Sequence, residues 1–177
     1  IEVSLAQVVD TQKPVEGLHV HFCKDVKEGV FEIGAKFELS VSEEKRELTA
    51  RHHSATHLLQ SALIEVLGDH VKQAGSGVSY DRLRFDFTHP EAWSKNQIEK
   101  VEKLVNQKIQ EALSVTAKLM TKDEATQKGA MALFGEKYGD EVRVLEMGDF
   151  SLELCGGIHV ENTKDIGLFT IHFETSL

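Results

Sequence analysis

The hydrophobic pattern of this chain changes its period near residue 48, and that change limits the fold more than any other feature of the sequence. Before it, short runs rich in β-branched residues alternate with turn signals that contain Gly or Pro. After it, apolar residues recur at helical spacing from Ala55 to Leu67, and Gly68 is a suitable helix end. We therefore predict a small β-barrel-like subdomain over residues 1–48 and a second domain over residues 49–177. The strands expected in the first segment are Val3 to Val9, Leu18 to Cys23 and Lys36 to Val41.

The second segment mixes helices and strands. Ser94 and Gln97 form a capping box that opens one helix, and Thr121 and Glu124 form another. The first of these helices turns Val101, Val105 and Ile109 inward, and the second is expected to carry Met131, Leu133 and Phe134. Strands are expected at Leu83–Phe87, Val142–Glu146, Phe150–Leu154 and Leu168–Phe173. This order indicates an α+β fold, with an antiparallel α/β two-layer sandwich after the barrel-like subdomain.

The charge balance bears on the partners of the chain. The 177 residues carry a net charge of −9, which argues against a broad, sequence-blind coat for nucleic acid. Residues 49–90, however, hold as many basic as acidic residues, so a phosphate contact is best sought there. No apolar run is long enough for a membrane helix and no signal peptide is evident. A cytoplasmic protein without a membrane partner is expected. Because the chain begins at Ile1, it is expected to be a piece of a longer polypeptide.

Two histidines four residues apart, His53 and His57, lie on one face of the expected helix. Such a pair can bind one metal ion together, although two histidines on a polar helix face are an equally good interpretation. The residue after His53 is Ser54. A zinc peptidase of the His-Glu-x-x-His type would have its glutamate base there, so the peptidase class is excluded.

A second pair, Cys155 and His159, follows about a hundred residues later with Gly156 and Gly157 between them. Glycine tolerates the positive φ angles of a tight loop, so the thiolate and the imidazole can be turned toward one point. Taken alone, Cys155 is equally well interpreted as a buried cysteine at a strand end. Together the two pairs provide three nitrogens and one sulfur, a set suited to tetrahedral Zn²⁺. We predict one zinc ion per domain, held in the α/β sandwich.

Longer motifs carry a family resemblance. The stretches concerned are His53-Ser-Ala-Thr-His57-Leu-Leu, Gln73 in a Val-x-Gln-x-Gly-Ser context, Leu83-Arg-Phe-Asp-Phe87, Gly129 to Tyr138, Met147-Gly-Asp-Phe150, Glu153-Leu-Cys-Gly-Gly157 and Asp165-Ile-Gly-Leu-Phe169. In this order they resemble the editing domain of alanyl-tRNA synthetases of the bacterial type. The resemblance spans essentially the whole chain.

This resemblance implies an aminoacyl-tRNA ester hydrolase within a parent ATP-binding alanine–tRNA ligase. Its substrates would be Ser-tRNA(Ala) and Gly-tRNA(Ala), cleaved at the ester to the terminal adenosine. The implied partners are the tRNA(Ala) acceptor end and the aminoacylation and C-terminal domains of the parent enzyme, with no DNA. A freestanding deacylase that acts in trans, and a zinc-stabilised RNA-binding module without catalysis, are the alternatives.

The resemblance also implies roles for particular residues. His53, His57, Cys155 and His159 match the zinc positions of the family, and Cys155 is thereby part of the catalytic set. Gln73 matches a glutamine that positions the ester or the attacking water, and Thr56 matches a residue that recognises the amino-acid side chain. Without the family, Thr56 is as readily a helix threonine that bonds its own backbone, and Gln73 a solvated loop residue.

Substrate contacts are expected from the glycines and from the neutral middle segment. The N–H groups of Gly156 and Gly157 are placed to contact a carbonyl oxygen, with a plain turn as the alternative. Lys72, Arg82 and Arg84 are candidates to hold the tRNA acceptor end, with ordinary solvated charge as the alternative.

Two residues depart from the family pattern. Ile158 replaces a usual threonine, and His52 a common asparagine. Both changes bear on fine specificity more than on metal binding. The sequence leaves open whether the zinc is structural or catalytic: with all four ligands bound it has no open position, whereas a loose ligand would admit water.

Overall fold

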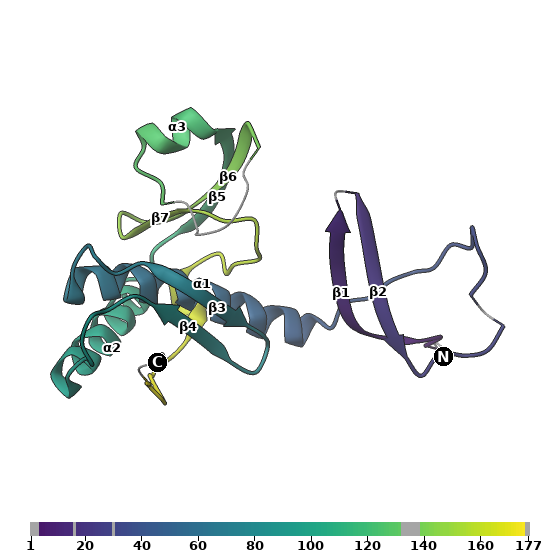
Figure 1. Ribbon diagram of the computed structural model, residues 1–177, viewed down its shortest axis with the longest axis horizontal. Helices are drawn as coiled ribbons and strands as arrows, with labels where there is room; N and C mark the ends of the chain where they lie inside the picture. Colours follow the sequence, from purple (N-terminus) through teal and green to yellow (C-terminus); the bar gives the residue numbers. More distant parts are fainter. Residues whose placement is uncertain (1–3, 16, 30, 132–138, 176–177) are drawn as a thin grey trace. The chain divides into compact units, whose positions relative to one another are not determined.

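The computed structural model describes residues 4–15, 17–29, 31–131 and 139–175. Within it the chain divides into two compact units, residues 1–40 and 41–177 (Figure 1).

The first unit is a two-stranded antiparallel hairpin. Strand β1 (Gln7–Val15) pairs with β2 (Leu18–Lys24), and Gly17 supplies the positive φ that the tight connection requires. Among the described residues of this unit no third strand forms, and Lys36–Val41 is irregular. The expectation of a barrel is therefore corrected to an open hairpin, because a barrel needs further strands to close on. Val3, at the start of an expected strand, lies outside the described residues.

The second unit is built around one long helix, α1 (Glu43–Leu67). Ser42 caps its start by accepting a hydrogen bond from the backbone N–H of Lys45, and two acidic residues occupy the first turn. Residue 48 thus lies inside α1. The first turns of the helix are exposed and lack the apolar periodicity that marks the later ones. The helix ends at Gly68, as predicted.

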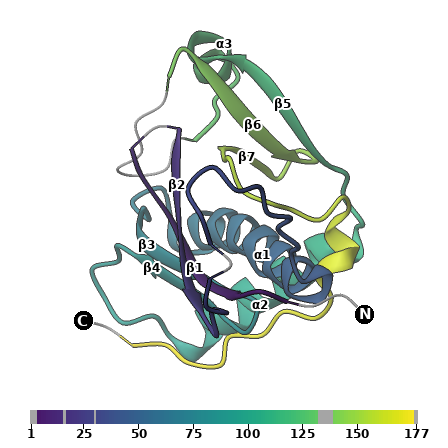
Figure 2. The same ribbon diagram turned by 90° about the vertical axis from the view of Figure 1, so that its right-hand side faces the viewer.

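Two layers enclose α1 (Figures 1 and 2). On one side lie helix α2 (Lys95–Gln110) and the hairpin of β3 (Gln73–Val78) with β4 (Leu83–Phe87). On the other side lies a three-stranded sheet. Its strands are β5 (Val115–Thr121), β6 (Glu141–Met147) and β7 (Ser151–Leu154), all antiparallel, and helix α3 (Lys122–Gln127) packs on β5 and β6. The predicted α+β class with antiparallel sheets is confirmed.

The core lies where α1 meets these layers. Leu58, Ala62 and Leu63 of α1 are completely buried, as are Val101 and Val105 of α2. Both predicted capping boxes are present, at Ser94 and at Thr121. Burial of this apolar face contributes roughly 25 cal/mol per Å² of area removed from water, and it fixes the side of α1 that is turned toward β7.

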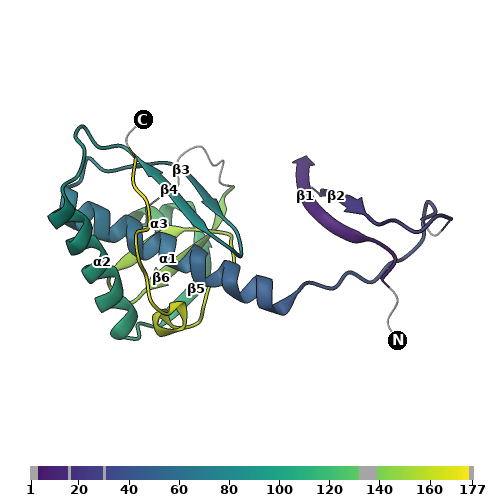
Figure 3. The same cartoon turned by 90° about the horizontal axis from the view of Figure 1, so that it is seen from below.

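Two expected elements differ in the structure. Leu168–Phe173 is not a strand (Figure 3, yellow). Side chains of α2 bind its main chain instead, because Asn106 accepts from the N–H of Phe169 and donates to its carbonyl. The second difference is that α3 ends at Gln127, so Met131 lies beyond it and forms an isolated bridge with Glu153. Leu133 and Phe134 lie outside the described residues.

A short 3₁₀ helix, η1 (Thr163–Ile166), follows the loop after β7. Across the described part of the chain, every helix is too short or too polar to cross a membrane.

Candidate metal centre

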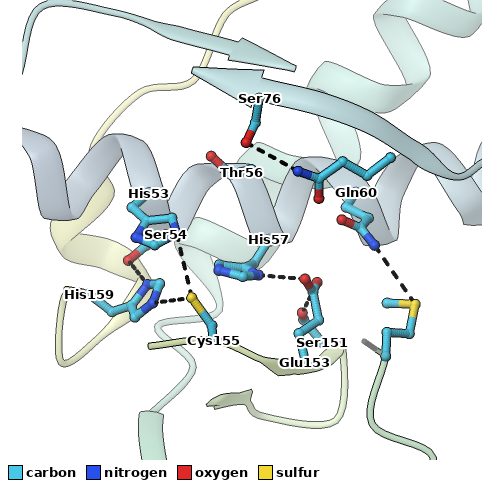
Figure 4. A network of polar contacts seen from close by, with 12 residues as sticks. His53, Ser54, Thr56, His57, Gln60, Ser76, Ser151, Glu153, Cys155 and His159 are labelled. Carbon is cyan, nitrogen blue, oxygen red and sulfur yellow. Dashed lines mark hydrogen bonds and ion pairs between the residues drawn. The ribbon is translucent and has the colours of Figure 1, made fainter. Parts of the chain in front are cut away.

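The two ligand pairs predicted from the sequence meet in the structure. His53 and His57 project from the same face of α1 toward the loop that follows β7, which carries Cys155 and His159 (Figure 4). The four donor atoms all lie within 4.8 Å of one another. A tetrahedral zinc ion with bonds of 2.0–2.3 Å needs its ligands roughly 3.3–3.8 Å apart, so the cluster is close to that size.

The sulfur lies between the histidines. Cys155 Sγ is 3.5 Å from His53 Nε2 and 3.3 Å from His159 Nε2. Cys155 and His57 are buried, whereas His53 and His159 are partly exposed. The centre therefore has an inner side against β7 and an outer side toward solvent.

The loop can approach α1 this closely because residue 157 is glycine. A Cβ at Gly157 would lie 2.0 Å from Cε1 and 2.4 Å from Nδ1 of His53, whereas Gly156 has no atom within 4 Å of that position. Neither glycine has a positive φ. The reason expected from the sequence, a left-handed turn, is corrected: Gly157 is required for space.

Arg143 of β6 holds the loop in place through two hydrogen bonds. Its Nη1 donates to the carbonyl of Cys155 at 2.8 Å and to that of Gly157 at 2.9 Å. The backbone N–H of Gly157 also helps to lower the pKa of the Cys155 thiol. The loop is thus held in the shape that places its sulfur.

A buried carboxylate supports His57. Glu153 Oε2 accepts from His57 Nδ1 at 2.7 Å, and its other oxygen accepts from the hydroxyl of Ser151 at 2.9 Å. Glu153 is fully buried. The remaining nitrogen, His57 Nε2, is buried without a partner in the described structure. Since a buried polar atom normally has a partner, this unpaired nitrogen indicates a ligand.

Ser54, one residue after His53, also belongs to the centre. Its hydroxyl lies 3.4 Å from His159 Nδ1 and accepts from the N–H of Val160 at 3.1 Å. Ser54 occupies the position that excluded a peptidase, and here it anchors the second pair to α1.

The protonation of the centre also suits a cation. Burial opposes ionisation of the Cys155 thiol, but hydrogen bonds from His159 and His53 lower its pKa to about 3. Burial lowers the pKa of His159, which keeps that imidazole neutral. Burial alone would also lower the pKa of His57, yet the neighbouring Cys155 and Glu153 side chains raise it to about 9, so a metal ion bound by this imidazole would displace a proton. A thiolate and a carboxylate together carry the charge that a dication balances. The residues therefore fit Zn²⁺.

Thr56 and Gln73, both expected to contact substrate, lie on and beside the face of α1 that is turned toward the β3–β4 hairpin. Thr56 points toward strand β3, and its hydroxyl donates to the carbonyl of His52 at 3.0 Å (Figure 4). Gln73, the first residue of β3, donates from Nε2 to Ser76 Oγ at 3.1 Å. Its Oε1 is buried without a partner in the described structure.

The three basic candidates are on the β3–β4 hairpin or just before it. Lys72, Arg82 and Arg84 are exposed, and Arg84 lies 3.2 Å from Asp86. Among the residues that the structure describes, none of the three shares a hydrogen bond or ion pair with the metal ligands.

The two residues that depart from the family pattern lie beside the ligands. His52 Nδ1 donates to the carbonyl of Ser79 at 2.7 Å, which ties α1 to the β3–β4 turn. Ile158 lines a shallow groove together with Arg51 and Arg143.

The sequence predicts no role for Glu153, Ser151, Ser54 or Arg143. Only Glu153 carries a usable signal, because it is a carboxylate between two leucines and stands two residues before Cys155.

The fold and the donor set define an α+β domain with a candidate metal site. Residues 142–176, which include Cys155 and His159, match the family described as the threonyl and alanyl tRNA synthetase second additional domain. The chain as a whole is similar to part of the alanine–tRNA ligases. It is 52% identical over 174 residues to that of Acidithiobacillus ferridurans, and 51% identical over 176 residues to that of Listeria welshimeri.

These alignments cover 98% and 99% of the chain but 20% of each relative. The chain spans about a fifth of the length of the relatives it matches. Over nearly its whole length it is thus related to one segment of the alanine–tRNA ligases, and the resemblance indicated by the motifs is confirmed.

Proposed function

We propose that this chain is the editing segment of an alanine–tRNA ligase and that it hydrolyses the aminoacyl ester of Ser-tRNA(Ala) and Gly-tRNA(Ala). The observation that carries the proposal is the convergence of His53, His57, Cys155 and His159 on one point, in a chain related to alanine–tRNA ligases over nearly its whole length. The fold alone would support many activities.

Such an activity meets a physical need of alanine selection. A pocket shaped for alanine cannot exclude the smaller glycine, and it rejects serine poorly because one hydroxyl adds little bulk. Differences of that size discriminate by roughly a hundredfold. A second site that removes the wrong amino acid supplies the remaining accuracy.

Thr56 and Gln73 are the residues that we assign to the substrate. The Thr56 hydroxyl donates its hydrogen bond to the carbonyl of His52. Its oxygen can therefore accept a hydrogen bond from the hydroxyl of a serine side chain. Gln73 Oε1 is a buried acceptor without a partner, and it suits an N–H or O–H of the aminoacyl ester or of the attacking water.

The metal would be held by the four converging side chains. These residues would hold Zn²⁺ between the loop after β7 and α1, and the ion would supply Lewis acidity where a ligand position is open. The chain's own residues hold the loop (Arg143), orient the imidazoles (Glu153 and Ser54) and position the ester (Gln73).

The tRNA acceptor end is the proposed partner. We assign its phosphates to three exposed basic residues that lie near Gln73 in sequence, Lys72, Arg82 and Arg84. The other domains of the parent ligase would supply most of the affinity for tRNA. Because the net charge is −9, the isolated chain should bind tRNA weakly and with a shallow salt dependence.

The test is a deacylation assay with Ser-tRNA(Ala), Gly-tRNA(Ala) and Ala-tRNA(Ala). The chain is assayed alone and in place of the matching segment of the Listeria welshimeri alanine–tRNA ligase, to provide tRNA binding. Hydrolysis of the seryl and glycyl esters but not of the alanyl ester supports the proposal. An exchanged ligase that aminoacylates normally but leaves Ser-tRNA(Ala) intact contradicts it and favours a non-catalytic RNA-binding module. Equal activity of the chain alone would favour a deacylase that acts in trans.

A further inference from the structure

We infer that Glu153 and Ser151 form a positioning relay that selects Nε2 of His57 as the metal-binding atom and sets the affinity of the centre. The inference rests on the proposed metal site, but not on the proposed hydrolysis.

The geometry of the relay leaves His57 one free nitrogen. Nδ1 is 2.7 Å from Glu153 Oε2, and a carboxylate can only accept, so in the neutral form of the imidazole, the form that can bind a metal, the proton is on Nδ1. Nε2 is then the lone-pair nitrogen. It is the atom that lies buried without a partner in the described structure.

The relay is fixed on the side away from the metal. Ser151 donates its hydroxyl to Glu153 Oε1 at 2.9 Å, and both residues lie on β7, whose pairing with β6 sets their positions. The exposed fraction of the side chain is 0% for Glu153 and 2% for His57. Because neither group has access to water, the Nδ1–H of His57 depends on Glu153 for its hydrogen bond, and the two oxygens of Glu153 depend on His57 and Ser151.

Charge gives the carboxylate a second role. A buried carboxylate without a compensating charge is costly. Metal at Nε2 strengthens the Nδ1–H donor and brings positive charge near the carboxylate, so the ion and Glu153 stabilise each other through the imidazole. Partners of this kind typically change metal affinity by about 10–100-fold when they are removed.

Three variants separate hydrogen bonding from charge. Glu153→Ala removes both, Glu153→Gln keeps an oxygen that accepts from Nδ1 but removes the charge, and Ser151→Ala removes only the outer hydrogen bond. Glu141→Gln is the matched control, because Glu141 is exposed at the start of β6. All are made in the full chain.

Zinc affinity is measured by competition with a chromophoric chelator, without tRNA. We expect a loss of about 10–100-fold for Glu153→Ala, a smaller loss for Glu153→Gln, a few-fold loss for Ser151→Ala and no change for Glu141→Gln. Unchanged affinity in both Glu153 variants would overturn the inference. If Glu153→Ala does not fold, Glu153→Gln and Ser151→Ala still decide the question.

The atom selected is tested separately with ¹⁵N-labelled histidine. NMR of the zinc-loaded chain should show a protonated Nδ1 and a metal-bound Nε2 at His57, and Glu153→Gln should retain that tautomer. Coordination through Nδ1 would overturn the inference. Normal zinc affinity together with absent deacylation would contradict the proposed function and leave the relay intact, so the two failures are distinguishable.

Discussion

The main chain at Gly157 lies directly against the imidazole of His53, so close that a Cβ would stand 2.0 Å from the ring. This contact joins the loop after β7 to helix α1 at the point where the two ligand pairs meet. We therefore expect Gly157→Ala to displace either the loop or His53 and to weaken zinc binding by about 10–100-fold. Gly156→Ala is the matched control because its Cβ would meet no atom within 4 Å. Equal zinc affinity in the two variants would show that zinc binding does not need the close contact between the Gly157 main chain and the His53 ring.

Removal of the metal should destabilise the second unit. Cys155 supplies the one sulfur ligand of the cluster. In such sites the free energy of metal binding adds to the free energy of folding. A strong chelator should lower the thermal unfolding midpoint of the zinc-loaded chain by about 5 °C or more. Cys155→Ala should start low and not respond to the chelator. Cys23→Ala should behave as the parent chain, because Cys23 is exposed on β2. A midpoint that is the same with and without chelator would contradict a metal that stabilises the fold.

Gln73 should affect hydrolysis without affecting the metal. Within the described structure, its side chain forms one hydrogen bond, from Nε2 to Ser76, and none to the four ligands. Gln73→Ala should lower the rate of Ser-tRNA(Ala) hydrolysis by roughly tenfold or more, with zinc content unchanged. Gln127→Ala, at the exposed end of α3, serves as the control. A Gln73→Ala variant with full activity would remove this residue from the proposed site.

Thr56 should determine which ester is hydrolysed. Thr56→Val keeps the shape of the side chain but deletes the oxygen that we assign to the serine hydroxyl. The ratio of Ser-tRNA(Ala) to Gly-tRNA(Ala) hydrolysis should fall by about tenfold. Thr49→Val is a close control, because Thr49 lies on the same helix and also donates to a carbonyl one turn earlier, that of Lys45. A fall of equal size in both variants would indicate a general effect on α1.

Much of the site could be predicted from the sequence because its signals are local. His53 and His57 are four residues apart, and so are Cys155 and His159. Each pair can therefore be recognised within a short stretch of sequence. The capping box at Ser94 and the helix end at Gly68 are likewise set by neighbouring residues.

The remainder depends on contacts between distant segments. Glu153 reaches His57 only after β7 packs on α1, and Leu168–Phe173 loses its expected strand because Asn106, on α2, binds the main chain of Phe169. Gly157 is explained by the ring of His53 rather than by its own φ. No periodicity in the sequence encodes these pairings.

The most direct test of the account is the initial rate at which serine is released from Ser-tRNA(Ala) by the ligase that carries this segment, measured zinc-loaded, zinc-stripped and reloaded. The account predicts hydrolysis in the loaded and reloaded enzyme, little in the stripped enzyme, and none in Cys155→Ala under any of the three conditions. Serine release by Cys155→Ala at the rate of the parent enzyme would contradict the claim that His53, His57, Cys155 and His159 form the centre on which editing depends.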